Sequence, residues 1–343
     1  MKVGVLTGGG DAPGLNSAIR AVVKKCEQYG FEAVGIKRGW AGLLELDTTE
    51  LKYEEIKNII HRGGTFLKTS RTNPLKISGG IEKASQNFKK LGLDALIAIG
   101  GDDTLGVAAA LSKAGLNVVG IPKTIDHDVP ETEFTIGFDT AVNQAMRLIE
   151  NLQDTAASHD RVFVVEIMGR HAGWIALYSG IAAGADLILI PEEPFSIKEL
   201  TDFVKKKIEK EGGQSVVIVV AEGAVITDYK GPIKKDATID QFGHVRLGGI
   251  GEFLAKEIQE ATGAETRSAV PAHAIRGGPP TALDRFVSTR LGLAAVDLIK
   301  EGKFGYMVAL RCGEIVSVPL AKATGRTKTV SKELYEEAKV FFK

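Results

Sequence analysis

A lysine and two aspartates follow a short apolar run in the first half of the chain. Residues 118–121 are apolar, and after Pro122 the chain reads Lys-Thr-Ile-Asp-His-Asp over residues 123–128. A carboxylate beside a phosphate can act as a general base towards an alcohol, and Lys123 supplies positive charge where phosphate oxygens would gather. Asp126 and Asp128 lie two residues apart, so we expect both to face one side of an extended backbone. We interpret His127, between them, as a hydrogen-bonded structural imidazole rather than a metal ligand.

Two adjacent carboxylates follow another apolar run. Residues 93–99 lead into Gly100, Gly101, Asp102, Asp103 and Thr104. Neighbouring carboxylates repel each other, and a magnesium ion shared with substrate phosphates would neutralise them. The alternative is an acidic turn in which Asp103 or Thr104 caps the next helix. The pattern leaves both interpretations open.

A glycine-rich loop follows the first apolar run of the chain. Residues 8–14 read Gly-Gly-Gly-Asp-Ala-Pro-Gly and precede a predicted helix. Glycine lets backbone amides approach a phosphate closely, and a helix N-terminus adds partial positive charge. The spacing matches neither GxGxxG nor GxxxxGK[ST]. A tight turn and a phosphate-binding loop therefore both remain open.

Polar side chains also follow the later apolar runs. Arginine binds phosphate through a planar fork, so several arginines near strand ends in a neutral protein suggest a sugar-phosphate pocket. A single surface arginine is more commonly in an ion pair. The residues that carry this hypothesis are Met168, Gly169 and Arg170 after residues 161–167, Glu222 after residues 216–220, and then Arg267, His273 and Arg276.

Short buried strands and amphipathic helices must position these residues. Continuous apolar runs of this length predict strands of a parallel sheet that is covered on both faces, and alternation with helices predicts a doubly wound α/β fold. Ligands of such sheets bind beyond the carboxyl ends of the strands. We predict helices over residues 15–26 and 142–152 and an irregular excursion over residues 230–249. The predicted strands cover residues 3–6, 95–99, 118–121, 162–167, 187–190 and 216–220.

Length and composition restrict the class of protein. A chain of 343 residues fits two domains of ordinary size, and 44% hydrophobic residues with 25% charged residues indicate a globular protein. Lysine plus arginine equals aspartate plus glutamate, 43 each, which gives no reason to expect nucleic acid or a membrane as partner. Cys26 and Cys312 form no CxxC motif, so we expect two buried thiols in a reducing, cytoplasmic setting.

Six motifs, taken in this order, resemble the phosphofructokinases over nearly the whole chain. Any one of them is weak alone, and the ordered set is specific. They are Gly-Gly-Asp-Ala-Pro-Gly-Leu-Asn at residues 9–16, Gly-Gly-Asp-Asp-Thr at 100–104, Pro-Lys-Thr-Ile-Asp at 122–126, Thr-Ile-Gly-Phe-Asp-Thr-Ala at 135–141, Met-Gly-Arg at 168–170, and Arg-Gly-Gly at 276–278.

The resemblance implies a role for each matching residue. It implies that Asp126 is the general base for the 1-hydroxyl of fructose 6-phosphate and that Asp102 is the carboxylate associated with Mg²⁺. The implied partners of Asp126 in the reaction are Thr124, Asp128, Lys123 and Arg170. The implied contacts to the phosphoryl donor are Gly10, Arg71, Gly101, Asp103, Thr104 and Lys123. The implied sugar-phosphate contacts are Thr124, Met168, Gly169, Arg170, Glu222, His273 and Arg276, with Arg161 and Arg267 from a neighbouring subunit.

The same resemblance implies an architecture and an assembly. We expect two doubly wound, Rossmann-like α/β domains with the active site in the cleft between them. Residues 1–138 plus about 275–322 would bind the donor, and residues 139–274 plus about 323–343 would bind fructose 6-phosphate. Because Arg161 and Arg267 would complete a neighbouring site, we expect a homodimer or homotetramer.

Two positions favour pyrophosphate over ATP as the donor. ATP-using relatives typically carry glycine at the position of Asp103 and often at that of Lys123. A carboxylate where the α-phosphate of a nucleotide would lie costs roughly a thousand-fold in affinity, whereas Lys123 can pair with a terminal phosphate of pyrophosphate. Asp103 thus repels ATP, while Lys123 holds pyrophosphate. A pyrophosphate-dependent reaction should run in both directions.

Several alternatives remain open. The first is an ATP-dependent 6-phosphofructokinase, and acceptors such as sedoheptulose 7-phosphate are also compatible with the motifs. An NAD or lipid kinase, a dehydrogenase and a non-catalytic sugar-phosphate-binding subunit fit fewer of them. One departure from the family pattern stands at His127, where asparagine is usual; an imidazole there predicts some pH sensitivity in the neighbouring carboxylates.

Overall fold

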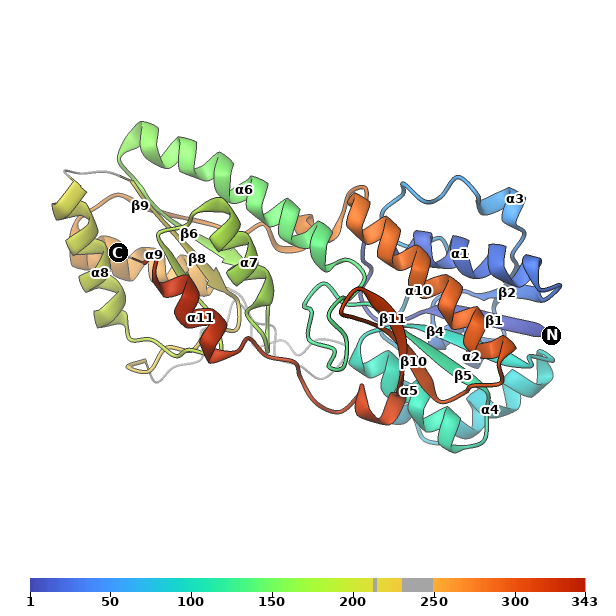
Figure 1. Ribbon diagram of the computed structural model, residues 1–343. Helices are drawn as coiled ribbons and strands as arrows, with labels where there is room; N and C mark the ends of the chain where they lie inside the picture. The colour runs from blue at the N-terminus through green and yellow to red at the C-terminus, as the bar shows by residue number, and fades with distance from the viewer. Residues whose placement is uncertain (212–214, 230–248, 343) are drawn as a thin grey trace. The chain divides into compact units, whose positions relative to one another are not determined.

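The chain forms two compact units, each built on its own β-sheet (Figure 1). The structure is a computed structural model that describes residues 1–211, 215–229 and 249–342, so the predicted excursion over residues 230–249 lies outside the described residues except for Gly249. The first unit comprises Met1–Ile125, Val129–Thr140 and Arg276–Thr327, and the second comprises Asp126–Asp128, Ala141–Ile275 and Lys328–Lys343. Which ligand each unit binds, and the cleft site, stay predictions.

A seven-stranded sheet organises the first unit. Its strand order is β11-β10-β5-β4-β1-β2-β3, with parallel pairing from β10 to β2 and antiparallel pairing at the two edges. The strands are β1 (Lys2–Thr7), β2 (Glu32–Ile36), β3 (Thr48–Glu50), β4 (Ala95–Gly100), β5 (Val118–Pro122), β10 (Tyr306–Arg311) and β11 (Glu314–Pro319). The helices are α1 (Leu15–Gln28), α2 (Trp40–Glu45), α3 (Tyr53–Ile56), η1 (Pro74–Lys76), α4 (Gly80–Lys90), α5 (Asp102–Lys113), α10 (Ala282–Lys300) and η3 (Leu320–Lys322).

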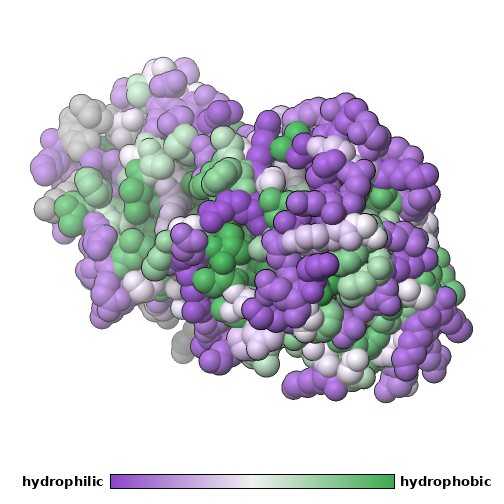
Figure 2. Space-filling model, turned by 45° about the vertical axis from the view of Figure 1, so that its right-hand side comes forward, coloured by the Kyte–Doolittle hydropathy of each residue, from purple (hydrophilic) through white to green (hydrophobic). Residues whose placement is uncertain are grey.

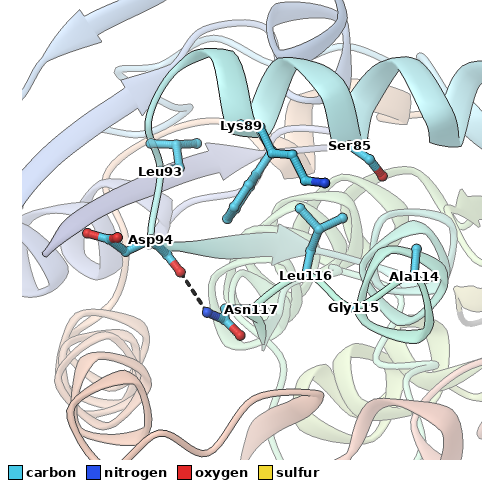
Figure 3. Close-up of a pocket in the computed structure, with 9 residues that line it drawn as sticks. Ser85, Lys89, Leu93, Asp94, Ala114, Gly115, Leu116 and Asn117 are labelled. Carbon is cyan, nitrogen blue, oxygen red and sulfur yellow. Dashed lines mark hydrogen bonds between the residues drawn. The ribbon is translucent and has the colours of Figure 1, made fainter.

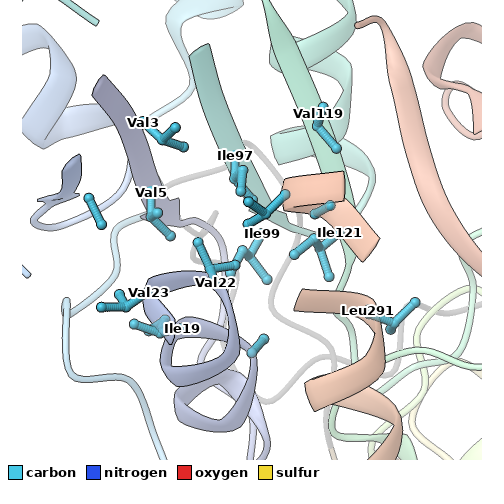
Figure 4. Close-up of a cluster of buried hydrophobic side chains, with 14 of the residues drawn as sticks. Val3, Val5, Ile19, Val22, Val23, Ile97, Ile99, Val119, Ile121 and Leu291 are labelled. Atoms are coloured by element: carbon cyan, nitrogen blue, oxygen red, sulfur yellow. The ribbon is translucent and has the colours of Figure 1, made fainter. Parts of the chain in front are cut away.

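The first unit buries apolar side chains on both faces of its sheet. Helices α1 and α10 pack side by side on one face, where Ile19, Val22 and Leu291 meet Val and Ile side chains of β1, β4 and β5 (Figures 1 and 4). On the opposite face, strand and helix side chains including Leu96 and Leu105 form a second buried cluster. Burial of each Val, Leu or Ile side chain contributes about 1.5–3 kcal/mol, so the continuous apolar runs of the sequence are explained by two-sided burial.

A four-stranded parallel sheet organises the second unit, with strand order β7-β8-β6-β9. Its core joins β6 and β8 to α8 and α9. Helix α6 (Phe138–His159) begins in the first unit and continues into the second. The other elements are β6 (Val162–Ile167), α7 (Trp174–Ala183), β7 (Leu187–Leu189), α8 (Ile197–Glu211), β8 (Val216–Ala221), α9 (Ile250–Thr262), β9 (Thr266–Ala269), η2 (Ala272–Arg276) and α11 (Lys332–Lys339).

The surface and the cysteines complete the description. Hydrophilic side chains cover most of the face in Figure 2, and hydrophobic ones are scattered among them. No helix among the described residues is both long and apolar enough to span a membrane. Cys26 is buried as predicted, but the prediction for Cys312 was wrong: Cys312 is exposed, with a φ of 47°, in the turn that joins β10 to β11.

Candidate active site

The glycine loop lies at the point where the chain order of the first sheet reverses. The strands order as β5-β4-β1-β2, so the loops after β1 and β4 diverge to opposite sides, which is where doubly wound sheets bind ligands. The N–H of Gly8 donates to the carbonyl oxygen of Ile99 at 2.9 Å, and that of Gly9 donates to Ser70 at 3.0 Å. Gly9 has a φ of 79°, which favours glycine. The loop is thus fixed against the end of β4 and the segment before Arg71.

Two cationic side chains contact this loop at Gly10. The ammonium of Lys123, a residue that is only 2% exposed, donates to the carbonyl oxygen of Gly10 at 2.5 Å. The guanidinium of Arg276 donates to the carbonyl oxygen of Asp11 at 2.9 Å. A Cβ atom at Gly10 would lie 2.1 Å from Nη2 of Arg276, so only glycine leaves that guanidinium its place. Two positive charges therefore flank the loop and favour an anion, and that of Arg276 also lies 3.7 Å from the carboxylate of Asp11.

The two adjacent aspartates occupy the first turn of α5. The N-cap is Gly101, which has no side-chain cap, so neither Asp103 nor Thr104 caps the helix as the alternative interpretation required. Both carboxylates are exposed. Oδ1 of Asp102 accepts a hydrogen bond from the N–H of Gly325 at 2.8 Å, and Oδ1 of Asp103 accepts one from Nδ2 of Asn73 at 2.9 Å. The partial positive charge of the helix N-terminus stabilises both negative charges.

The remaining predicted donor contacts lie around the same loops. Arg71 is exposed and directly follows Ser70, whose carbonyl oxygen binds Gly9. Thr104 is buried, and a Cβ atom at Gly8 would lie 2.5 Å from its hydroxyl oxygen, so this side chain fills the space beneath the glycine loop. A Cβ atom at Gly101 would lie 3.8 Å from Cβ of Thr124. The first unit thus brings together most of the predicted donor residues.

The segment that carries the predicted general base is a turn. The expectation of an extended backbone from Asp126 to Asp128 was wrong, because His127 has a φ of 57°. Such a left-handed conformation costs about 1 kcal/mol for a residue with a Cβ atom and is tolerated best by glycine, asparagine, aspartate and histidine. The asparagine that is usual at this position in the family and the histidine found here share that tolerance.

His127 is the structural imidazole that the sequence favoured. It is 6% exposed, its ring meets the ring of Trp174 edge-on at 5.4 Å between centroids, and its Nε2 lies 2.8 Å from Nζ of Lys328. Burial, together with the positive charge of Lys328, lowers the pKa of His127 to about 3. The ring is therefore neutral near pH 7.

The predicted sugar-phosphate residues of the second unit come from two neighbouring loops. Met168, Gly169 and Arg170 follow β6, and Glu222 follows β8, which pairs with β6 in parallel. The N–H of Gly223 donates to the carbonyl oxygen of Gly169 at 3.1 Å. A Cβ atom at Gly223 would lie 2.0 Å from the carbonyl oxygen of Arg170, so close packing of the two loops requires glycine there.

Electrostatics connect this pocket to the predicted base. Burial and, to a smaller extent, the negative charge of Asp126 raise the pKa of Glu222 to about 7, while the positive charge of Arg170 opposes the shift. Asp126, Arg170 and Glu222 are therefore close enough to influence one another. Near pH 7 the carboxyl of Glu222 is partly protonated, so it can donate as well as accept a hydrogen bond.

Arg161 and Arg267 lie at the other end of the same sheet. Arg161 precedes β6, and Arg267 is in register with Phe163 near the start of that strand. Both arginines pair with Glu265, at 2.9 and 2.6 Å. Six strand residues at about 3.3 Å each separate this pair from Met168 by about 20 Å, so these arginines do not join Met168 and Arg170 within one chain. His273 is exposed on η2.

Three contacts were not foreseen from the sequence. Asn73 orients Asp103, Lys328 contacts His127, and buried Asp284 binds the 135–141 motif by accepting hydrogen bonds from Gly137 and Thr140. Each pairs residues that are 30 or more positions apart, so no local pattern points to the contact. The only sequence signal is the placement of Asn73 before Pro74, which is typical of a helix N-cap.

One cavity lies away from the predicted site, and Asp102 is the candidate metal ligand within it. A cavity of about 280 Å³ lies at the amino ends of β4 and β5, lined by residues that include Asp94 and Asn117, and is therefore not at the glycine loop (Figure 3). Within residues 1–211, 215–229 and 249–342, no group of three or more His, Cys, Asp or Glu side chains is placed to hold a metal ion. Asp102 alone still fits Mg²⁺, which binds one or two carboxylates plus substrate phosphates.

Comparison with known proteins agrees with these observations. The phosphofructokinase family model matches residues 2–299. The chain is 54% identical to the pyrophosphate–fructose 6-phosphate 1-phosphotransferase of Amycolatopsis methanolica, with 100% of both chains covered. It is 47% identical to an ATP-dependent 6-phosphofructokinase of Streptomyces coelicolor, also over 100% of both chains. Pichia pastoris phosphofructokinase in the T-state superposes with a TM-score of 0.82 and 32% identity, covering 94% of this chain and 35% of that chain.

Proposed function

The chain belongs to the phosphofructokinase family, and we propose that it transfers a phosphoryl group reversibly from pyrophosphate to the 1-hydroxyl of fructose 6-phosphate. The proposal covers Mg²⁺ as the metal, a cytoplasmic location and a role in glycolysis or gluconeogenesis. It is supported by the name of the 54% identical relative and by the ordered motifs. The ATP-dependent alternative is supported by relatives at 47% identity.

The carboxylate of Asp103 carries the choice of donor. It sits on the first turn of α5, two residues after Gly101, and is held by Asn73. A third phosphate approaching this turn meets a fixed negative charge, and pyrophosphate lacks that third phosphate. Lys123 at Gly10 supplies positive charge for the two phosphates that both donors share.

Transfer requires a base, charge neutralisation and alignment. Asp126 accepts the proton of the sugar hydroxyl, while Glu222, partly protonated near pH 7, donates a hydrogen bond to a sugar oxygen. Arg170 and Lys123 stabilise negative charge on the phosphoryl oxygens, and Gly10 lets the donor approach the backbone. Asp102 would hold Mg²⁺, which when bound supplies further positive charge to the phosphate oxygens.

The proposal includes an assembly. Arg161 and Arg267 lie about 20 Å along the sheet from the other sugar-phosphate residues, and their shared partner Glu265 keeps them together. We therefore assign these two arginines to the site of a neighbouring subunit, in a homodimer or homotetramer. Arg276 and His273 complete the proposed set of sugar-phosphate contacts.

Product analysis tests the reaction. Purified enzyme, MgCl₂, fructose 6-phosphate and pyrophosphate should give fructose 1,6-bisphosphate and phosphate in equal amounts by ³¹P NMR. Fructose 1,6-bisphosphate with phosphate should regenerate pyrophosphate. Product from sedoheptulose 7-phosphate would widen the acceptor range. Absence of bisphosphate from a folded enzyme that turns over in neither direction would contradict the proposed function.

A further inference from the structure

The C-terminal segment of the second unit is bound to the turn that carries the predicted general base. The N–H of Lys328 donates to the carbonyl oxygen of Asp128 at 2.8 Å. The ammonium of the same residue lies 2.8 Å from Nε2 of His127. Main chain and side chain of Lys328 thus contact two successive residues of the turn, about 200 positions earlier in the chain.

Trp174 contacts both Lys328 and His127. Its indole Nε1–H donates to the carbonyl oxygen of Lys328 at 2.7 Å. The ammonium of Lys328 lies 5.4 Å from the centroid of the Trp174 ring, within the range of a cation–π contact. The same ring meets His127 edge-on. The imidazole is therefore enclosed by an aromatic ring and a cation, and both contacts fix its position.

The chemistry of the contact fixes the tautomer of His127. An ammonium only donates hydrogen bonds, so Nε2 must accept and the proton of the neutral ring sits on Nδ1. This holds at the pH of the reaction because His127 stays neutral there. The contact is thus a charge-assisted hydrogen bond in a partly buried setting, where it is stronger than on the open surface.

The segment that follows Lys328 is itself anchored. The carboxylate of Glu192 accepts hydrogen bonds from the N–H groups of Gly173 and Val330, at 3.0 and 2.9 Å, and so ties the start of α7 to this segment. The hydroxyl of Tyr335 on α11 donates to the carbonyl oxygen of Ile188 at 2.7 Å. Helix α11 lies beside α7 in Figure 1. Lys328 is therefore held by a rigid support.

We propose that Lys328 is a positioning residue for catalysis: through His127 and the carbonyl of Asp128 it holds the turn in the left-handed conformation that aims the carboxylate of Asp126. The proposal rests on the proposed function, since it gives Asp126 the role of general base. If the carboxylate of Asp126 is misaligned, the reaction slows but the affinity for fructose 6-phosphate is unchanged. We therefore expect loss of Lys328 to lower kcat and to leave the KM for fructose 6-phosphate unchanged.

The test compares Lys328→Met with Lys332→Met, a substitution of an exposed lysine on the same segment. In the pyrophosphate assay we expect Lys328→Met to lower kcat by about 10- to 100-fold with KM within about threefold of wild type. Lys332→Met should keep wild-type values. Inactive wild-type enzyme would refute the proposed function itself. Active wild type with unchanged kcat in a folded Lys328→Met variant, or a rise in KM alone, would refute only the role of Lys328.

Coupling between the two side chains separates positioning from general stabilisation. Glycine tolerates positive φ, so His127→Gly keeps the backbone accessible while removing the imidazole. We expect it to lower kcat as well, and the double variant with Lys328→Met to fall within about threefold of the weaker single variant. If the losses of kcat in the two single variants multiply in the double variant, the proposal is overturned. If thermal melting shows that the Lys328→Met variant does not fold, an unchanged kcat in the His127→Gly variant would still refute the proposal.

Discussion

Donor choice belongs to the scale of single residues, and we propose that Asp103 determines it. Its carboxylate is exposed, so solvent screening weakens its repulsion of a nucleotide. The hydrogen bond from Asn73 compensates by fixing where the charge lies, and Asn73 is itself oriented by the N–H of Leu75 at 2.9 Å. Discrimination between pyrophosphate and ATP then depends on the position of the Asp103 charge as much as on its presence.

We predict that Asp103→Gly raises kcat/KM for ATP by about 10- to 100-fold, because the charge facing a third phosphate is removed. Asn73→Ala should raise it by a smaller factor, since the carboxylate remains but is no longer held. Steady-state kinetics with each donor measures both values. Unchanged ATP use in folded Asp103→Gly enzyme would contradict the electrostatic explanation.

Glu222 predicts a pH dependence of stability. Its pKa in the folded chain is about 7, above the ordinary value of 4.5, so the folded state binds the proton more tightly than the unfolded state. The stability that this proton contributes is present below pH 4.5 and is lost as pH rises through 7. Relative to Glu222→Gln, wild type should lose up to about 3 kcal/mol between pH 5 and 8. Parallel melting curves of the two proteins over this range would contradict the prediction.

At the scale of elements, the strand–loop–helix units around the glycine loop set the geometry of the proposed donor site. Strand β1, its loop and α1 are positioned by two-sided burial of the sheet. The geometry of this loop then depends on its glycines, and among residues 8–10 the closest approach is at Gly10. We therefore predict that a single methyl group added to this loop lowers activity.

We expect Gly10→Ala to lower kcat/KM by about 100-fold, because the new Cβ atom would displace the guanidinium of Arg276. Gly106→Ala is the matched control: its Cβ atom would meet nothing within 4 Å, and alanine favours the helix interior. The control should keep full activity and melt at the same or a higher temperature. Activity of Gly10→Ala within a few-fold of wild type would show that Arg276 does not depend on this glycine.

How far the sequence predicts the elements depends on their burial. All six predicted strands are present as parallel strands, because two-sided burial leaves continuous apolar runs. Strands β3, β9 and β11 were not predicted because these edge strands lack such runs, and the interior strands β2 and β10 were missed as well. The turn at residues 126–128 was misjudged because the left-handed φ of His127 depends on contacts with Trp174 and Lys328, which lie far away in sequence.

At the scale of the whole molecule, the question is how many chains make one active site. The ion pairs of Arg161 and Arg267 with Glu265 hold both arginines at the amino ends of β6 and β9, whereas Met168 and Glu222 follow the carboxyl ends of β6 and β8. Parallel pairing fixes these two groups at opposite ends of one sheet. If all four residues serve one substrate, two chains must supply them.

Subunit mixing tests this requirement. Asp126→Asn and Arg161→Ala should each be nearly inactive alone, the first for lack of a base and the second for lack of a phosphate ligand. Refolded together in equal amounts, they should recover about a quarter of wild-type activity, because half of random dimers are mixed and each mixed dimer has one intact site. Mixtures no more active than the separate variants would contradict a shared site.

The central claim is that the enzyme prefers pyrophosphate because a fixed negative charge on α5 excludes the nucleotide. The most direct measurement is a competition in which wild-type enzyme, Mg²⁺ and fructose 6-phosphate receive equimolar pyrophosphate and ATP, with donor consumption followed by ³¹P NMR. We predict that pyrophosphate is consumed at least about 100-fold faster than ATP. Equal consumption of the two donors, or faster consumption of ATP, would contradict the account.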